Sequence, residues 1–250
     1  MMAPWPFVQW GLDISSLLPL GTRQMKFLIV GIDYFTKWVE AKPLAKIMQQ
    51  NVKNFIWKNI VCKFGIPRLL VSNNGRQFDN TPFRDFCEQF GIKNHYSSPS
   101  HPQANRQIEA ANQSLLKIIK TWLKGWKGVW PDELPRVLWA YRMTMRTPIG
   151  ESPFKLAYGS EAVILVEVHM ANQMVMKYQD KDNEKQLRLN LDLIDEVRMD
   201  AKQRTTRYKN LMARQYNAMA KPRHFNIGDL ILKRVSLATK NRTHGKLGPN

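Results

Sequence analysis

Three polar residues of the sequence stand where side chains can gather at one edge of a sheet. Asp13 ends the first predicted strand, Asn73 directly follows a short apolar strand, and Glu109 lies near the start of a long predicted helix. Thirty-five residues separate Asn73 from Glu109. Carboxylates can transfer protons, and their oxygens are the ligands that hard divalent cations prefer. These residues are therefore candidates for chemistry at the strand ends.

Hydrophobic periodicity predicts that the surrounding elements form a mixed α/β sheet covered by helices. Residues 26–33 are a continuous apolar run of strand length, whereas residues 35–41 alternate and suit a half-exposed strand. Residues 49–64 have helical spacing, and the Gly-Ile-Pro that follows ends that helix. Further strands are predicted at residues 7–14, 68–72 and 93–96, and further helices at 81–90 (with Thr81 as N-cap), 102–122 and 130–145.

Five separate blocks of the sequence carry a family pattern in a fixed order. They are WGLDI, FLIVGIDYFTKWVEA, FGIPRLLVSNNGRQF, FCEQFGIKNHYSSPSHPQANRQIEAANQSLL and LWAYRMTMRTPIGESPFKLAYG. Together, over roughly residues 8–170, they resemble the integrase core of plant long-terminal-repeat retrotransposons of the Ty3/Gypsy type. The resemblance implies a ribonuclease-H-like fold and a catalytic, metal-binding set of two Asp and one Glu. The first Asp corresponds to Asp13 and the Glu to Glu109, but the position of the second Asp holds Asn73.

The activity implied by the resemblance is DNA integration, in which 3′ processing and strand transfer proceed by metal-dependent phosphoryl transfer. Two Mg²⁺ or Mn²⁺ ions can stabilise both the attacking and the leaving oxygen. Asn73 offers one neutral carbonyl oxygen, and its NH₂ group points donors at a cation site. We therefore expect weakened metal binding and little strand transfer. An asparagine here also has an ordinary structural interpretation, because Asn-Asn-Gly is a good turn sequence.

Other polar residues near the predicted site have simpler explanations. Asp33 ends a strand near Asp13 and could substitute as a ligand, although an acid at such a position more often caps a turn. Asp79 is better explained as a solvated turn residue. His95 and His101 lack the spacing of a zinc pair with either cysteine, so we expect surface or loop histidines near the site.

Basic and amide side chains beyond Asn73 and along the Glu109 helix are candidates for phosphate contacts. The candidate nucleic-acid-binding residues are Arg76, Arg106, Gln113, Lys117 and Lys120. Arg106 stands where family members usually have Gly, so it adds charge but removes backbone freedom. A solvated basic helix face explains the same residues equally well. The helical spacing of Trp122, Trp126, Trp130 and Trp139 favours core or interface positions over base stacking.

Composition narrows the class of protein. The 250 residues carry 38 Lys+Arg against 20 Asp+Glu, a net charge of +18, with 44% hydrophobic residues. This content is too apolar for a disordered chain, and no run is long enough to span a membrane. The two cysteines exclude a disulfide scaffold and a four-cysteine zinc site, and suggest reduced thiols in an intracellular protein. The excess positive charge indicates a polyanionic partner, most often nucleic acid.

The composition becomes more polar near Gln173, and we place a domain boundary there. We expect an integrase-core-like domain at residues 1–170, an amphipathic helical linker at 171–220, and an SH3-like C-terminal barrel at 221–250 that is truncated and poorly ordered. Residues 181–219 lack Pro and Gly and have helical spacing, which suits a linker helix that helps self-association. The zinc module that normally precedes such a core is expected to be missing, as in a polyprotein fragment or a decayed element.

These observations leave more than one function open. The first hypothesis is a nuclear integrase-like protein that acts on element ends and target DNA as a homo-oligomer, with catalysis impaired at Asn73. The alternatives are a non-catalytic DNA-binding or assembly module and a decayed relic without a selected role. A ribonuclease-H-like nuclease that cleaves RNA is a weaker possibility.

Overall fold

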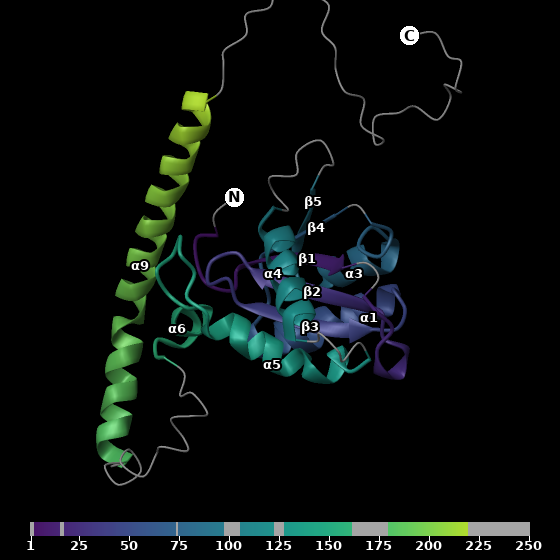
Figure 1. Ribbon diagram of the computed structural model, residues 1–250, viewed down its shortest axis with the longest axis horizontal. Coiled ribbons are helices and arrows are strands. Elements are labelled where there is room, and N and C mark those ends of the chain that lie inside the picture. Colours follow the sequence, from purple (N-terminus) through teal and green to yellow (C-terminus); the bar gives the residue numbers. More distant parts are fainter. Residues whose placement is uncertain are drawn as a thin grey trace, which may run out of the picture. The chain divides into compact units, whose positions relative to one another are not determined.

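The computed structural model describes residues 3–15, 18–73, 75–97, 106–122, 128–161 and 180–219. The chain divides into two compact units, Met1–Arg207 and Tyr208–Asn250, and each is considered by itself. The sheet, the core and the candidate site all belong to the first unit (Figure 1). The predicted boundary near Gln173 and the predicted barrel at residues 221–250 lie outside the described residues.

A five-stranded mixed sheet forms the centre of the first unit. Its strands lie in the order β3-β2-β1-β4-β5. The first three strands form an antiparallel meander. β4 pairs in parallel with β1, and β5 pairs in parallel with β4, which requires the helical connections that precede both strands. The bounds are β1 Gln9–Ser15, β2 Phe27–Asp33, β3 Val39–Leu44, β4 Leu69–Asn73 and β5 Lys93–Ser97. This order of elements confirms the predicted mixed α/β sheet.

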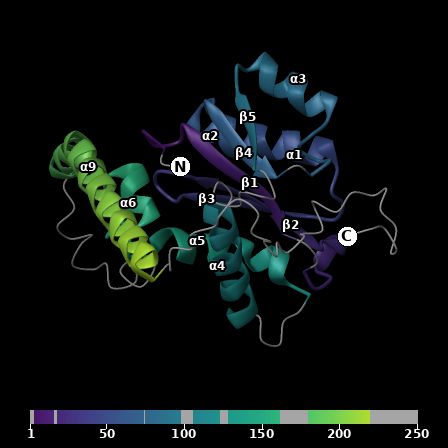
Figure 2. The ribbon, with the colours of Figure 1, turned by 90° about the horizontal axis from the view of Figure 1, so that it is seen from above.

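Helices cover both faces of the sheet (Figure 2). The helix predicted at residues 49–64 is present as α1 Gln49–Phe55, a π-helical segment Ile56–Val61 and α2 Cys62–Phe64. It ends at Gly65, whose φ of 88° suits glycine. The other helices are α3 Thr81–Gln89, α4 Arg106–Trp122, α5 Trp130–Met143, α6 Pro153–Tyr158 and α9 Asp180–Met219, with a 3₁₀ turn at Thr22–Gln24.

Two local predictions were wrong. The N-cap of α3 is Asn80 rather than Thr81, because the Oδ1 atom of Asn80 accepts a hydrogen bond from the backbone N–H of Phe83 at 3.0 Å. The strand predicted at residues 35–41 begins only at Val39. The Asp33 carboxylate accepts hydrogen bonds from the N–H and the hydroxyl of Thr36, each at 2.7 Å, and this turn delays the strand.

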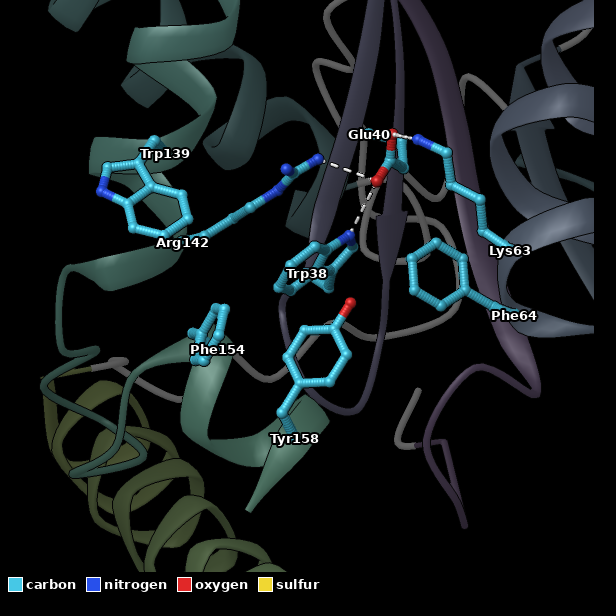
Figure 3. A pocket seen from close by; sticks show the side chains of 8 residues that line it. All are labelled: Trp38, Glu40, Lys63, Phe64, Trp139, Arg142, Phe154 and Tyr158. Carbon is cyan, nitrogen blue, oxygen red and sulfur yellow. Dashed lines mark hydrogen bonds and ion pairs between the residues drawn. The ribbon is translucent and has the colours of Figure 1, made fainter. Parts of the chain in front are cut away.

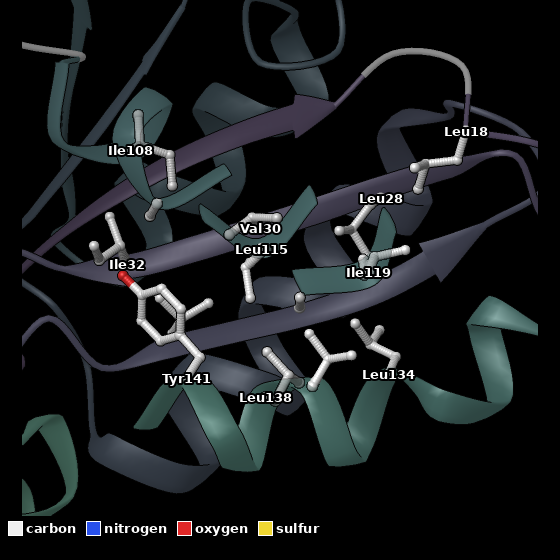
Figure 4. Close-up of a cluster of buried hydrophobic side chains, with 14 of the residues drawn as sticks. Leu18, Leu28, Val30, Ile32, Ile108, Leu115, Ile119, Leu134, Leu138 and Tyr141 are labelled. Carbon is white, nitrogen blue, oxygen red and sulfur yellow. The ribbon is translucent and has the colours of Figure 1, made fainter. Parts of the chain in front are cut away.

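Each face of the sheet carries its own hydrophobic core. The core under α4 and α5 contains Leu28, Val30 and Ile32 of β2 (Figure 4). The core under α1 and α3 takes Leu12, Ile29 and Leu70, which alternate along their strands with the residues of the first core. Trp130 is buried in the first core as predicted, and its Nε1 donates to the backbone oxygen of Pro19 at 2.9 Å. Trp139 is exposed and so is not a core residue, and its position at an interface stays a prediction.

A small third cluster packs the first part of α9 against α6. It contains Ile149, Leu156 and Ala201, with Val197 alongside. Arg198 adds hydrogen bonds to two backbone oxygens at the end of α6, and Arg204 pairs with Glu151 at 3.0 Å. The helix predicted at residues 181–219 is thus confirmed. Within the part of the chain that the structure describes, none of the helices is both long and apolar enough to cross a membrane.

Candidate metal and nucleic-acid site

Asp13 and Asn73 meet at the carboxyl ends of two neighbouring strands. β1 and β4 are parallel, and Gly11 lies opposite Val71, so positions 13 and 73 are at the same level. The amide nitrogen Nδ2 of Asn73 donates a hydrogen bond to Oδ1 of Asp13 at 3.1 Å. The sequence order of the strands predicted this meeting, and the geometry confirms it.

Asn73 is held in this orientation by its own loop. Its Oδ1 atom accepts the backbone N–H of Gly75 at 2.9 Å. Because the oxygen is engaged by the loop, the NH₂ group is directed at Asp13. The turn interpretation of Asn73 is therefore confirmed, and the same amide contacts the carboxylate of Asp13. The role of Asn73 in a metal site stays a prediction.

Asn112 is a second amide on the same carboxylate. This residue of α4 is buried, and its Nδ2 donates to Oδ2 of Asp13 at 2.6 Å. Our sequence interpretation missed it. A signal was present, because Asn112 lies on the apolar stripe of α4 between Ile108 and Leu115, where a polar residue requires a buried partner.

Asp13 is half-buried, and its surroundings act on its pKa in opposite directions. Burial raises the pKa of Asp13, while hydrogen bonds from the Ile14 backbone and from the amides of Asn112 and Asn73 lower it. The negative charge of Glu109 raises the pKa of Asp13 further. Glu109 is an exposed residue of α4, and its membership of a shared site with Asp13 stays a prediction.

The directions of these hydrogen bonds show whether the site suits a pair of divalent ions. Both oxygens of Asp13 accept amide hydrogens, and the oxygen of Asn73 faces its own loop. Among the described residues there is no group of three or more His, Cys, Asp or Glu side chains that could hold a metal ion. The residues present therefore do not fit the bridged two-ion arrangement, which needs oxygen ligands rather than N–H donors.

Asp33 does not complete the site. The antiparallel register places Asp33 opposite Trp10, whereas Asp13 lies opposite Val30, so the two acids are at different ends of β1. Asp33 is fully buried, caps the Thr36 turn and accepts the backbone N–H of Phe7 at 3.0 Å. Burial raises its pKa to about 6 despite these donors. Its expected nearness to Asp13 was wrong, and the turn-capping alternative is confirmed.

The remaining candidates near the site occupy simpler positions. Asp79 is exposed and pairs with Arg84 at 2.9 Å, which confirms a solvated turn residue. His95 is an exposed residue of β5 opposite Val71, whereas His101 lies outside the described residues.

The structure describes the side chains of only some of the predicted nucleic-acid-binding residues. Arg76 is exposed in the turn after Asn73, and Gln113 and Lys117 are exposed on α4. Arg106 and Lys120 belong to the same helix, but their side chains are outside the described part of the structure. Their role on DNA stays a prediction.

The strand order and a match to a family model show what class of protein this chain is similar to. A mixed sheet in the order β3-β2-β1-β4-β5, with helices on both faces and with Asp13 beside Asn73 at the carboxyl ends of β1 and β4, has the ribonuclease-H-like fold that the solved integrase structures described below share. Residues 4–102 match the family model of the integrase core domain.

Comparison with known proteins finds similar sequences in retroviral polyproteins. The chain is 28% identical over 178 residues to the Gag-Pol polyprotein of avian reticuloendotheliosis virus, covering 69% of this chain and 15% of that protein. It is 31% identical over 156 residues to the Gag-Pol polyprotein of feline leukemia virus, covering 62% of this chain and 9% of the relative. The chain thus spans a small part of the relatives it matches. These matches support an integrase core of the retroviral and long-terminal-repeat class.

Solved structures show the same fold at low sequence identity. The simian T-cell lymphotropic virus intasome in complex with PP2A regulatory subunit B56 gamma matches with a TM-score of 0.58 and 17% identity, over 66% of this chain and 59% of that one. The HTLV-2 integrase catalytic core domain in complex with magnesium, in a trimeric form, matches with a TM-score of 0.51 and 17% identity, over 61% and 97%. The predicted ribonuclease-H-like fold is therefore confirmed.

Proposed function

We propose that this chain is an integrase-like protein of Ty3/Gypsy-type retrotransposons that binds DNA but catalyses integration weakly or not at all. The observation that carries the proposal is the 3.1 Å hydrogen bond from the Asn73 amide to Asp13. An N–H donor stands where the second carboxylate of the family would offer an oxygen to a metal ion. The family matches support integration as the ancestral activity.

A divalent ion would supply Lewis-acid stabilisation of phosphate oxygens during cutting and joining. Asp13 and Glu109 are the two carboxylates that would hold one Mg²⁺ or Mn²⁺ ion in this chain. Asn73 would contribute only a neutral oxygen, and only after its amide turns away from Gly75. The HTLV-2 relative contains magnesium, which makes this ion the natural one to test.

Charge supports DNA as the partner. The net charge of +18 favours association with a polyanion, and Arg76, Gln113 and Lys117 stand exposed around the site. DNA integration implies the nucleus as the place of action. A non-catalytic DNA-binding or assembly module uses the same surface, and a relic would keep the fold without a selected role.

Self-association is proposed through α9. Residues 180–200 carry seven acidic and four basic residues, whereas residues 201–219 carry five basic residues and no acidic one. Tyr208, Leu211 and Tyr216 are exposed large side chains of the basic half. Two copies of the helix in antiparallel orientation would place acidic halves beside basic halves. Light scattering should show a dimer or larger species that dissociates at high salt, and a monomer at low salt would refute the interface.

The proposed function predicts different results for DNA binding and for catalysis, both measured on the unmodified chain. Duplex DNA carrying element ends should bind with strong salt dependence, whereas strand transfer and nicking in Mg²⁺ or Mn²⁺ should give at most trace product. Efficient joining by the unmodified chain would overturn the proposed impairment. Absent DNA binding would favour the relic.

A further inference from the structure

The two amides on Asp13 join three elements that are far apart in the sequence. Asn73 of β4 donates to Oδ1 of Asp13 at 3.1 Å across 60 positions, and Asn112 of α4 donates to Oδ2 at 2.6 Å across 99 positions. Each carboxylate oxygen therefore accepts a different amide. We refer to Asp13, Asn73 and Asn112 together as the amide clasp.

Burial directs Asn112 at this carboxylate. The residue is 5% exposed and lies on the stripe of α4 that carries the core residues Ile108 and Leu115. Among the described residues its Oδ1 atom has no hydrogen-bond partner, so the bond to Asp13 is what partners the buried amide. Turning the amide around would place its oxygen against a carboxylate oxygen, and the NH₂ group therefore stays directed at Asp13.

The clasp continues into the turn that carries Arg76. The Oδ1 atom of Asn73 accepts the backbone N–H of Gly75 at 2.9 Å, and the carbonyl oxygen of Gly75 accepts two further N–H groups of the turn at 2.8 and 3.0 Å. The backbone oxygen of Arg76 accepts the Nδ2 of Asn80 at 2.8 Å. A continuous line of hydrogen bonds thus runs from α4 through Asp13 to the turn of Arg76.

The clasp links these elements by attraction and needs no ion to do so. Two carboxylates at the ends of β1 and β4 would repel each other until a cation neutralised them. In this chain N–H donors face both oxygens of Asp13 instead. Hydrogen bonds to an ionised acceptor are about twice as strong as those between neutral groups. The site is therefore ordered by the residues themselves.

We propose that the amide clasp takes over the linking role that a divalent ion would have between two carboxylates, and that it holds the turn of Arg76 in place to meet a DNA phosphate. Asp13 and Asn112 are then positioning residues, which act on Arg76 through Asn73 and Gly75. The DNA contact of Arg76 rests on the proposed function, whereas the clasp itself does not.

Melting temperatures in a chelating buffer test the clasp. Asn112→Leu puts an apolar side chain on an apolar stripe, which by burial alone would raise the melting temperature. We expect a fall of about 5 °C instead, because one oxygen of the half-buried Asp13 loses its donor. Asn112→Ser keeps a shorter donor and should show a smaller fall. Gln113→Leu, at the exposed neighbouring position, should shift the melting temperature by less than about 1 °C.

Duplex binding in the same buffer tests the positioning of Arg76. Fluorescence anisotropy with a labelled duplex of mixed sequence should show about fivefold weaker binding for Arg76→Ala and for Asn112→Leu, each below the unmodified chain. Asn112→Leu leaves the charge unchanged, so screening does not account for its effect. Added to Arg76→Ala, it should weaken binding no further, because the clasp acts through that turn.

Each part of the proposal has an outcome that overturns it. An unchanged or raised melting temperature for Asn112→Leu would refute the clasp, and so would a rise of more than about 3 °C when Mg²⁺ is added to the unmodified chain. An equal further loss of affinity in the Arg76→Ala background would refute the positioning of Arg76. Absent duplex binding by the unmodified chain would refute the proposed function and the DNA contact of Arg76, whereas the melting temperatures would still decide the clasp.

Discussion

Replacing Asn73 by Asp should raise Mg²⁺-dependent strand transfer by at least about 100-fold, because a metal ligand worth several kcal/mol in the transition state is regained. The substitution exchanges an N–H donor, 3.1 Å from Asp13, for a second carboxylate oxygen. Glu109 already contributes its charge to the same site. The measurement is the rate of joining labelled DNA ends by the unmodified chain and by Asn73→Asp.

The same substitution should also change the melting temperature, which can be measured without catalysis. In a metal-free protein two carboxylates would face each other, so Asn73→Asp should melt at a lower temperature in the presence of a chelator. Mg²⁺ should restore its melting temperature, whereas the unmodified chain should respond little. Asn80→Asp is the matched control, because Asp also serves as an N-cap and lies away from the site.

Three outcomes would contradict this account of the site. Addition of Glu109→Gln to Asn73→Asp should abolish the gained activity, and persistence of that activity would remove Glu109 from the catalytic set. Equal rates for the unmodified chain and Asn73→Asp would show that the amide does not limit catalysis. Inactivity of Asn73→Asp together with an unchanged response to Mg²⁺ would show that the two-ion site cannot be rebuilt by one residue.

The meeting of Asp13 with Asn73 could be predicted because it depends on strand order alone. A short apolar strand separated from the first meander by a helix tends to join the sheet in parallel, and parallel strands bring their carboxyl ends to one edge. Asp33 shows the limit of the same reasoning. Its strand is antiparallel to β1, so the end of β2 lies at the beginning of β1 and far from Asp13 along that strand.

Hydrogen-bond partners were harder to predict than element positions. Asn112 looks like an ordinary polar residue of an amphipathic helix until its neighbours Ile108 and Leu115 are known to face the core. The turn at Asp33 depends on a carboxylate that closes on Thr36, and periodicity does not register such local bonds. Glu40 was missed for a similar reason, because an acid in an alternating strand normally faces water.

Glu40 therefore leads to the largest expected change in stability. Glu40 is buried, and its two carboxylate oxygens accept hydrogen bonds from Arg142 at 2.8 Å and from Lys63 at 2.9 Å (Figure 3). Glu40→Gln replaces one of two engaged oxygens by an NH₂ group and removes the negative charge that both Arg142 and Lys63 share, so neither cation keeps its anion. We expect the free energy of unfolding in urea to fall by about 3 kcal/mol, the lower part of the range for breaking a buried pair, because Lys63 is half exposed.

The matched control for this prediction is Glu133→Gln, which breaks an exposed pair with Arg136 on the surface of α5. It should change the free energy of unfolding by less than about 0.5 kcal/mol, since water screens that pair. Equal effects of the two substitutions would mean that Glu40 does not clamp the edge strand. A selective loss would show that one buried carboxylate ties β3 to α5 and α2.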